Sequence, residues 1–162
     1  RLVNVGDQQG NRRKWIHLFE TVNVVLFFAS LVDFIEPSTV PQLQTKLDES
    51  LEYFRFVLDS LPLSRKDAIL FLTKKDILSA ILAAGNTNTP ISHPELRGVT
   101  DPKLCITNQQ KLFLSKCTDR GQKSGRVFSH TVCLLDIDEM KGTTRTALKD
   151  VLDANFRRHA MF

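Results

Sequence analysis

Four apolar segments alternate along the chain with amphipathic stretches. The segments are residues 1–5, 22–30, 68–72 and 127–135, and the second of them, VNVVLFFAS, is rich in β-branched and aromatic residues. Runs of this kind predict strands, and we expect those at 22–30 and 68–72 to be covered on both faces. The alternation of strands with helices favours an α/β fold with a mostly parallel sheet flanked by helices.

The amphipathic stretches place apolar residues at helical spacing. A long helix is predicted over residues 43–61, with an inner face made of Leu43, Leu47, Leu51, Phe54, Leu58 and Leu61. Shorter helices are predicted over 76–84 and 108–116, with a long loop at 85–102. A final helix is expected over 144–159, with an inner face of Leu148, Val151, Leu152 and Phe156.

The composition is that of an ordinary globular domain. The 162 residues are 42% hydrophobic and 25% charged, and 22 Lys and Arg against 18 Asp and Glu leave a net charge of +4. That excess is mild, so we expect no nucleic-acid partner. Three cysteines and four scattered histidines match no zinc spacing, which indicates reduced thiols of a cytosolic protein. Because the chain begins with Arg1 inside an apolar segment, we expect it to be a piece of a longer protein.

Polar turns directly follow three of the predicted strands. They are NVGDQ at residues 4–8, TKKD at 73–76 and VCLLD at 132–136. The carboxyl ends of parallel strands meet at one edge of a sheet, which is where open α/β sheets bind ligands. Each turn alone also has an ordinary explanation, because a strand-to-helix connection needs glycine or polar residues where it reaches solvent. Together they favour one ligand that contacts all three.

A guanine nucleotide fits these turns. A carboxylate such as Asp76 can accept two parallel hydrogen bonds from N1–H and the exocyclic amine of guanine, a donor pair that adenine lacks. Lys74 can lay its aliphatic stem along the base while its amine stays solvated. A backbone N–H of the VCLLD turn can donate to the base carbonyl. In the first turn, Gly6 lets the backbone approach a phosphate, and a polar neighbour can reach a bound cation.

These segments resemble the alpha subunits of heterotrimeric G proteins. GDQQGNRRKWIHLFE at residues 6–20 is similar to the family's switch II segment, and DESL at 48–51, ILFLTKKD at 69–76 and VCLLD resemble three further family motifs. Seven positions of the first segment match at fixed spacing: Arg12, Lys14, Trp15, Ile16, His17, Phe19 and Glu20.

The resemblance implies the carboxyl-terminal part of a Ras-like GTPase domain, with the fold of P-loop NTPases. Switch II would occupy residues 4–20, the guanine-specificity motif 73–76 and the receptor-facing final helix 144–162. The implied fold is incomplete in this sequence, because the phosphate loop, the first strand and the helical domain are absent from it. No G-x-x-x-x-G-K-[ST] pattern occurs among the 162 residues.

Roles follow from the resemblance alone. Gln8 would orient the water that attacks the γ-phosphate. The bound nucleotide, GTP or GDP with Mg²⁺, would contact Asn4, Val5, Gly6, Asp7, Gln8, Thr73, Lys74, Lys75, Asp76 and the backbone of Leu134. The beta-gamma dimer would meet Trp15, Leu18, Phe19 and Glu20, and a G-protein-coupled receptor would meet His159, Met161 and Phe162. A downstream effector and the cytoplasmic face of the plasma membrane are also implied, or the cytoplasm if the short chain stands alone.

Three departures from the family pattern weaken GTP binding. Asn4 replaces the Asp that reaches the magnesium site, so no metal ligand is assigned in this chain. Asp7 replaces a glycine beside the γ-phosphate and brings a carboxylate near a charged anion, and Gln9 replaces an arginine.

Three hypotheses therefore stay open. The first is a GTP-hydrolysing switch of which this chain is a part, and the second is a non-catalytic module that docks to beta-gamma or receptor. The third, an unrelated α/β domain, is disfavoured by the length of the switch II match. We expect the 162 residues alone to fold poorly and to bind nucleotide weakly, an expectation that submicromolar binding of fluorescent GDP would contradict.

Overall fold

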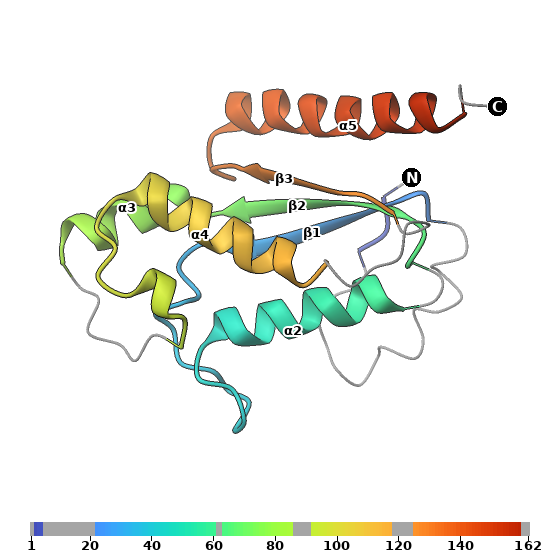
Figure 1. Ribbon diagram of the computed structural model, residues 1–162. Helices are drawn as coiled ribbons and strands as arrows, with labels where there is room; N and C mark the ends of the chain where they lie inside the picture. The colour runs from blue at the N-terminus through green and yellow to red at the C-terminus, as the bar shows by residue number, and fades with distance from the viewer. Residues whose placement is uncertain (1, 5–21, 61–62, 86–91, 118–124, 160–162) are drawn as a thin grey trace.

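Three parallel strands in the order β1-β2-β3 form the sheet of the computed structural model, which describes residues 2–4, 22–60, 63–85, 92–117 and 125–159 (Figure 1). The register is in step from Val24 opposite Asp67 to Ser30 opposite Thr73, and from Ala68 opposite Val127 to Leu72 opposite Thr131. The elements run β1 (Val24–Ser30), α2 (Lys46–Asp59), β2 (Asp67–Thr73), α3 (Lys75–Ala83), the 3₁₀ turn η2 (Pro94–Leu96), α4 (Pro102–Ser115), β3 (Val127–Thr131) and α5 (Ile137–His159).

The sheet separates two apolar layers, which supports the expected α/β class. Alternate residues of β2 point to opposite faces. Leu70 and Leu72 pack with α2, α3 and α4, whereas Ile69 and Phe71 pack with α5 on the other face (Figure 1). Every residue of β2 is buried, as the sequence predicts for a strand covered on both sides.

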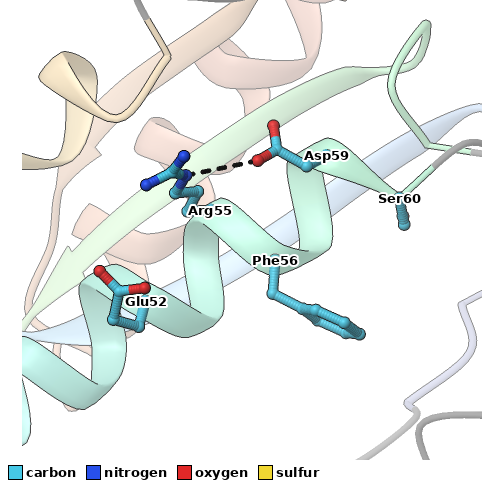
Figure 2. Close-up of a pocket in the computed structure, with 5 residues that line it drawn as sticks. All are labelled: Glu52, Arg55, Phe56, Asp59 and Ser60. Atoms are coloured by element: carbon cyan, nitrogen blue, oxygen red, sulfur yellow. Dashed lines mark ion pairs between the residues drawn. The ribbon is translucent and has the colours of Figure 1, made fainter.

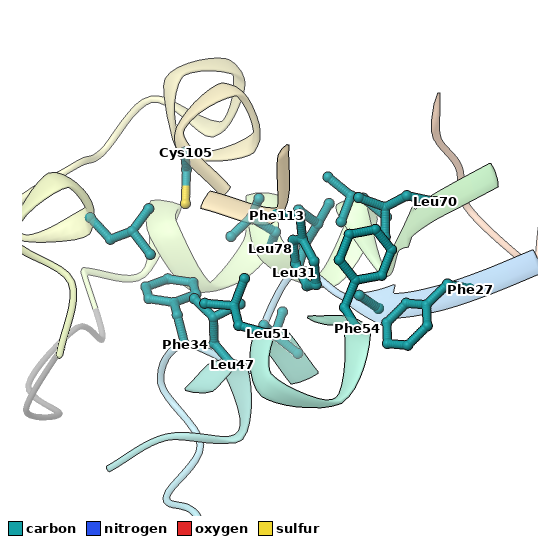
Figure 3. Close-up of a cluster of buried hydrophobic side chains, with 14 of the residues drawn as sticks. Phe27, Leu31, Phe34, Leu47, Leu51, Phe54, Leu70, Leu78, Cys105 and Phe113 are labelled. Carbon is teal, nitrogen blue, oxygen red and sulfur yellow. The ribbon is translucent and has the colours of Figure 1, made fainter. Parts of the chain in front are cut away.

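Aromatic rings fill the larger layer. Phe54 of α2 meets Phe27 of β1 edge-on, with ring centroids 4.9 Å apart, and meets Phe113 of α4 in the same way at 5.4 Å (Figure 3). Edge-to-face contacts of this kind add to the free energy gained from apolar burial. The three rings therefore join α2 to the sheet and to α4.

Helix α2 begins at a capping box. The Thr45 hydroxyl accepts from the amide of Asp48, and the Asp48 carboxylate accepts from the amide of Thr45 at 2.8 Å. The helix is therefore shorter than predicted, and Leu43 lies before it. The inner face is otherwise as predicted, because the residues at helical spacing inside these bounds are all buried: Leu47, Leu51, Phe54 and Leu58. Leu61 lies outside the described residues.

The inner face of the final helix is not the one predicted. Helix α5 begins seven residues early, at Ile137, and buries Ala147, Val151 and Ala154 against the sheet. Of the four predicted inner residues, Val151 is buried as predicted, but Leu148, Leu152 and Phe156 are 46%, 56% and 72% exposed. The alanines allow the helix backbone to approach β3 closely, so the larger side chains point to the flanks.

Three strand predictions were wrong in extent. Residues 2–4 are exposed and belong to no strand, because no described strand runs along the outer edge of β1 to pair with them. Strand β1 is open on one face at Leu26 and Phe28, since α5 lies over β2 and β3 instead. Strand β3 ends at Thr131 and not at 135, because the chain turns there towards α5.

The weak helix predicted over 108–116 is longer and spans Pro102–Ser115. The Asp101 side chain accepts from the amide of Lys103, and Pro102 occupies the first helical position, where its missing N–H has no effect on hydrogen bonding. The predicted loop at 85–102 therefore ends in a helix start that the sequence analysis placed too late.

Two glycines predict opposite responses to alanine. A Cβ at Gly125 would lie 1.7 Å from the carbonyl oxygen of Lys66, whereas one at Gly142, inside α5, would meet nothing within 4 Å. We expect Gly125→Ala to lower the free energy of unfolding by about 1–3 kcal/mol through the clash. Gly142→Ala should raise it by about 0.5–1 kcal/mol, because alanine has less backbone freedom to lose. Urea unfolding of the two variants measures both; equal effects would contradict this account.

Candidate functional site

Two of the three predicted turns lie at one edge of the sheet. Residues 73–76 follow β2 and residues 132–136 follow β3, and both strands run in the same direction (Figure 1). The amide of Val132 donates to the carbonyl of Leu72 at 2.9 Å, so the turns leave the sheet side by side. The structure therefore brings Asp76 and Leu134 to the same edge.

Thr73 is buried at the end of β2. Its hydroxyl donates to the carbonyl of Ala29 at 3.1 Å, and its own carbonyl accepts from the amide of Leu31 at 3.0 Å. Gln109 of α4 also donates to the carbonyl of Leu31, at 2.9 Å. The Thr73 side chain thus fixes the ends of β1 and β2 together, which makes the turn that follows a rigid platform.

Lys74 has an unusual backbone conformation. Its φ of 62° makes it the one non-glycine residue with positive φ in the described part of the chain. Such a conformation costs a lysine about 1–2 kcal/mol, and strain of this size is found mostly at binding and catalytic sites. The residue ends β2 and begins α3 without a side-chain cap. Its side chain is exposed.

Asp76 is exposed in the first turn of α3. Within the described residues it has no hydrogen-bond or ion-pair partner. A carboxylate placed in this way keeps both oxygens available for a ligand with two adjacent donors. Guanine presents such a pair in N1–H and its exocyclic amine.

The second turn offers backbone groups. Leu134 is 48% exposed, and the Asp136 amide bonds to the carbonyl of Cys133 at 3.2 Å. The Asp136 carboxylate accepts from the amide of Glu139 at 2.9 Å and so caps α5. An ion pair between Lys75 and Glu139 joins the two turns.

The end of β1 contributes residues that the sequence analysis missed. Asp33 lies near Lys74: burial raises the pKa of its carboxyl above the usual value, against the opposing effects of a hydrogen bond from Ser30 and the positive charge of Lys74. A sequence signal for this position exists, because Ser30 ends β1 and Asp33 follows it, as polar residues follow the other strands. The signal is weak, since this turn lacks glycine and a dense polar run.

Most of the predicted switch II residues cannot be placed. Asn4 is described and exposed, and in Figure 1 the segment 2–4, dark blue, lies far from α3, so the structure does not bring Asn4 beside Asp76. Ten further predicted site residues lie outside the described part of the chain: Val5, Gly6, Asp7, Gln8, Trp15, Leu18, Phe19, Glu20, Met161 and Phe162. For an eleventh, His159, only the backbone is described.

The described residues show neither a preformed metal site nor a membrane-spanning helix. They contain no group of three His, Cys, Asp or Glu side chains that could hold a metal ion. Cys105, Cys117 and Cys133 are free thiols. No helix in that same part of the chain is both long and apolar enough to cross a lipid bilayer.

A shallow groove lies on α2, away from both turns. Its lining comes from one stretch of helix: Glu52, Arg55, Phe56, Asp59 and Ser60 (Figure 2). Arg55 and Asp59 form an exposed ion pair at 3.5 Å. Glu52 pairs with Lys116 at the end of α4, at 3.5 Å. Because these polar groups are solvated and already paired, this groove offers no convergent chemistry.

Ser92, His93 and Asp48 form a cluster whose geometry suits a structural role and not catalysis. Ser92 donates to Asp48 at 2.9 Å and His93 Nε2 lies 3.0 Å from the same carboxylate. Both groups therefore contact the aspartate, so the serine has no base and the histidine no nucleophile. The cluster fastens the segment before η2 to the first turn of α2.

This cluster predicts a loss of stability in acid. Burial by itself raises the pKa of Asp48, but hydrogen bonds from Thr45 and Ser92 and the charge of His93 outweigh it and leave the pKa below its usual value. A carboxylate with a lowered folded-state pKa stabilises the protein above its unfolded pKa of about 3.9 and loses that contribution as the pH falls through the folded value.

Asp48→Asn should therefore lower the free energy of unfolding by about 1–2 kcal/mol at pH 7 and show a smaller further loss below about pH 4 than the unaltered protein. Urea unfolding at pH 7 and pH 3 measures this. Asp138→Asn is the control, because that side chain is 97% exposed. An equal acid response in the Asp48 variant would contradict the assignment.

Comparison with known proteins agrees with the sequence motifs. A profile of the family described as G-protein alpha subunit matches residues 1–152. The guanine nucleotide-binding protein subunit alpha-15 of Mus musculus is 29% identical over 167 residues, which cover 98% of this chain and 44% of that protein. The Oryctolagus cuniculus alpha-15 subunit is 32% identical, with 98% and 44% covered, and the Caenorhabditis elegans alpha-7 subunit is 26% identical, with 97% and 43% covered. The chain thus spans less than half the length of these relatives.

Proposed function

Because the chain belongs to the G-protein alpha subunit family, we propose that it forms the guanine-recognising part of a GTP-hydrolysing signalling switch. The observation that carries this proposal is the turn at residues 73–76. It places Asp76, exposed and without a partner in the described residues, after a buried strand at the carboxyl edge of a parallel sheet.

The base would lie between the two turns. Asp76 accepts from N1–H and the exocyclic amine of guanine, and a backbone N–H at Leu134 donates to O6. The Lys74 stem covers one face of the base, and the left-handed backbone at that residue sets the direction of the stem. Thr73 contributes through position, since its hydroxyl is already bonded to Ala29. Lys75 lies between two contact residues and holds the turn.

Hydrolysis would depend on residues near the amino end. Gln8 would orient the attacking water, and Val5, Gly6 and Asp7 would face the phosphates through their backbone groups. When bound, Mg²⁺ neutralises charge on the β- and γ-phosphates. Asn4 has a neutral side chain where the family pattern has an aspartate, so we assign no metal ligand at this position.

Protein partners would use two further surfaces. Trp15, Leu18, Phe19 and Glu20 would face the beta-gamma dimer, with a downstream effector as a later partner. The carboxyl end of the chain, with His159, Met161 and Phe162, would face a receptor at the cytoplasmic side of the plasma membrane. Leu148, Leu152 and Phe156 are exposed at a spacing of four residues along α5 and so share one side of the helix, which supports a role in contact because a row of exposed apolar side chains marks interfaces.

A second candidate function follows from two residues of the sequence. Asn4 and Asp7 both reduce affinity for a magnesium-bound triphosphate, through a lost negative charge at the cation and an added one at the anion. They favour a module that docks to beta-gamma or receptor without cycling GTP.

Nucleotide binding by the intact natural gene product tests the proposal. Fluorescent GDP should bind and be displaced by GTP and GDP but not by ATP, and GTP should be hydrolysed in single turnover. Binding without hydrolysis would favour the docking module. Failure of every guanine nucleotide to bind would contradict the proposed function.

Returning Asn4 and Asp7 to the residues of the family pattern tests how much they weaken GTP binding. Asn4→Asp with Asp7→Gly should strengthen GTP binding by about 10-fold or more, because each change removes an unfavourable charge effect of at least about 1 kcal/mol. Competition against fluorescent GDP measures the change, with Gln9→Arg as a separate variant. Unchanged affinity would show that these positions are not what weakens GTP binding.

A further inference from the structure

The two turns of the proposed base site need a fixed separation. Strands β2 and β3 pair only as far as Leu72 opposite Thr131, and the Val132 amide adds the last backbone hydrogen bond between them. Beyond that point residues 74–76 and 133–136 leave the sheet independently. A base held from both sides would require a contact that sets the distance between them.

We propose that the ion pair of Lys75 with Glu139 is this positioning contact, and that it sets the lifetime of bound guanine nucleotide. The inference rests on the proposed function. Lys75 Nζ donates to Glu139 Oε1, and within the described residues no other side-chain hydrogen bond or ion pair joins α3 or its leading turn to α5 or the turn before it.

Both ends of the ion pair are held by their own turns. Glu139 lies in the first turn of α5, where its amide donates to Asp136 at 2.9 Å. Lys75 is the first residue of α3 and follows the strained Lys74. The backbone is therefore fixed at both ends, so the ion pair couples the position of one turn to that of the other.

The alternation of exposure supports a positioning role. Lys74 and Asp76 are exposed, whereas Lys75 between them is half-buried and directed to α5. The ion pair thus holds the backbone at Lys75, which lies between the two residues proposed to contact guanine. A cation at the amino end of a helix is electrostatically unfavourable, so helix stability gives no reason for a lysine here.

The partial exposure of the Lys75–Glu139 ion pair distinguishes a positioning role from a role in folding stability. The side chains of Lys75 and Glu139 are 38% and 25% exposed, and ion pairs at such sites contribute little to stability. We therefore expect variants that lack the pair to unfold normally and still release nucleotide faster.

The test uses the intact natural gene product and four variants: Lys75→Gln, Glu139→Gln, the double variant, and Lys141→Gln. The last is a matched control, because it removes an exposed ion pair with Asp138 on the same helix. Release of fluorescent GDP, the ratio of GDP to IDP affinity, and the urea midpoint are measured for each. Inosine lacks the exocyclic amine, so the ratio reports on Asp76 alone.

Each single variant should release GDP about tenfold faster and lose part of the preference for GDP over IDP. The double variant should match the singles, because both remove the same interaction. Lys141→Gln should change neither quantity, and all urea midpoints should agree.

Three results would each overturn the inference while the proposed function stands. They are an unchanged rate of GDP release in the single variants, additive effects in the double variant, and urea midpoints that fall together with GDP affinity. If the unaltered protein binds no guanine nucleotide, the proposed function fails and the inference fails with it.

Discussion

Replacing Asp76 with Asn is expected to lower the affinity of the natural protein for GDP by about 100-fold or more. The carboxylate would accept two charge-assisted hydrogen bonds from guanine, each contributing about 1.5–3 kcal/mol, and an amide offers one neutral acceptor and a donor that meets the guanine amine. The same variant should gain affinity for xanthosine diphosphate, because xanthine presents a carbonyl where guanine presents its amine. Competition between the two nucleotides measures the reversal of preference.

Asp138→Asn is the matched control for this experiment. It removes a carboxylate near the start of α5 whose side chain is 97% exposed, and it should leave both affinities unchanged. Weaker GDP binding without any gain for xanthosine diphosphate would indicate general damage to the turn. Unchanged GDP affinity would remove Asp76 from the base site.

The second large effect concerns the aromatic core. Phe54→Ala should lower the free energy of unfolding by about 3–5 kcal/mol, since the ring is fully buried and its removal leaves a cavity against Phe27 and Phe113. This is a large share of the total stability of an ordinary domain. Urea unfolding with a tryptophan or circular dichroism signal measures the loss.

Phe56→Ala on the same helix provides the comparison. That ring is 47% exposed and faces the groove on α2, so its removal should change the free energy of unfolding by less than about 1 kcal/mol. Similar losses in the two variants would mean that α2 does not pack as described. A soluble and folded Phe54 variant with unaltered stability would have the same meaning.

The wrong predictions about strands and about α5 share a cause: each feature depends on residues that are close in space but distant in the sequence. A strand at residues 1–5 and full cover for β1 both require a neighbour along the outer edge of the sheet, and local pattern contains no information on whether one is present. The choice of Ala147 over Leu148 for the inner face of α5 depends on how closely the helix approaches β3. Periodicity counts apolar residues but does not measure that distance.

The candidate site divides in the same way. TKKD after a buried strand was recognisable because an acid and a lysine at this spacing resemble the family's guanine-specificity motif. The sequence did not predict the left-handed backbone of Lys74 or the partly buried Asp33. It also did not predict the ion pair of Lys75 with Glu139, because 64 residues separate the two and no local pattern links them.

The sequence by itself determined the alternation of strands and helices, the buried β2, the inner face of α2 and the family to which the chain belongs. Short-range periodicity and fixed motif spacing carry these features, and both are properties of neighbouring residues. Within the described residues, the tertiary structure alone decided which face of β1 is exposed, which side of α5 faces inward and which charges meet across the two turns. These features arise from packing between distant segments, where close approach and the desolvation of charge select one arrangement among many that the sequence allows.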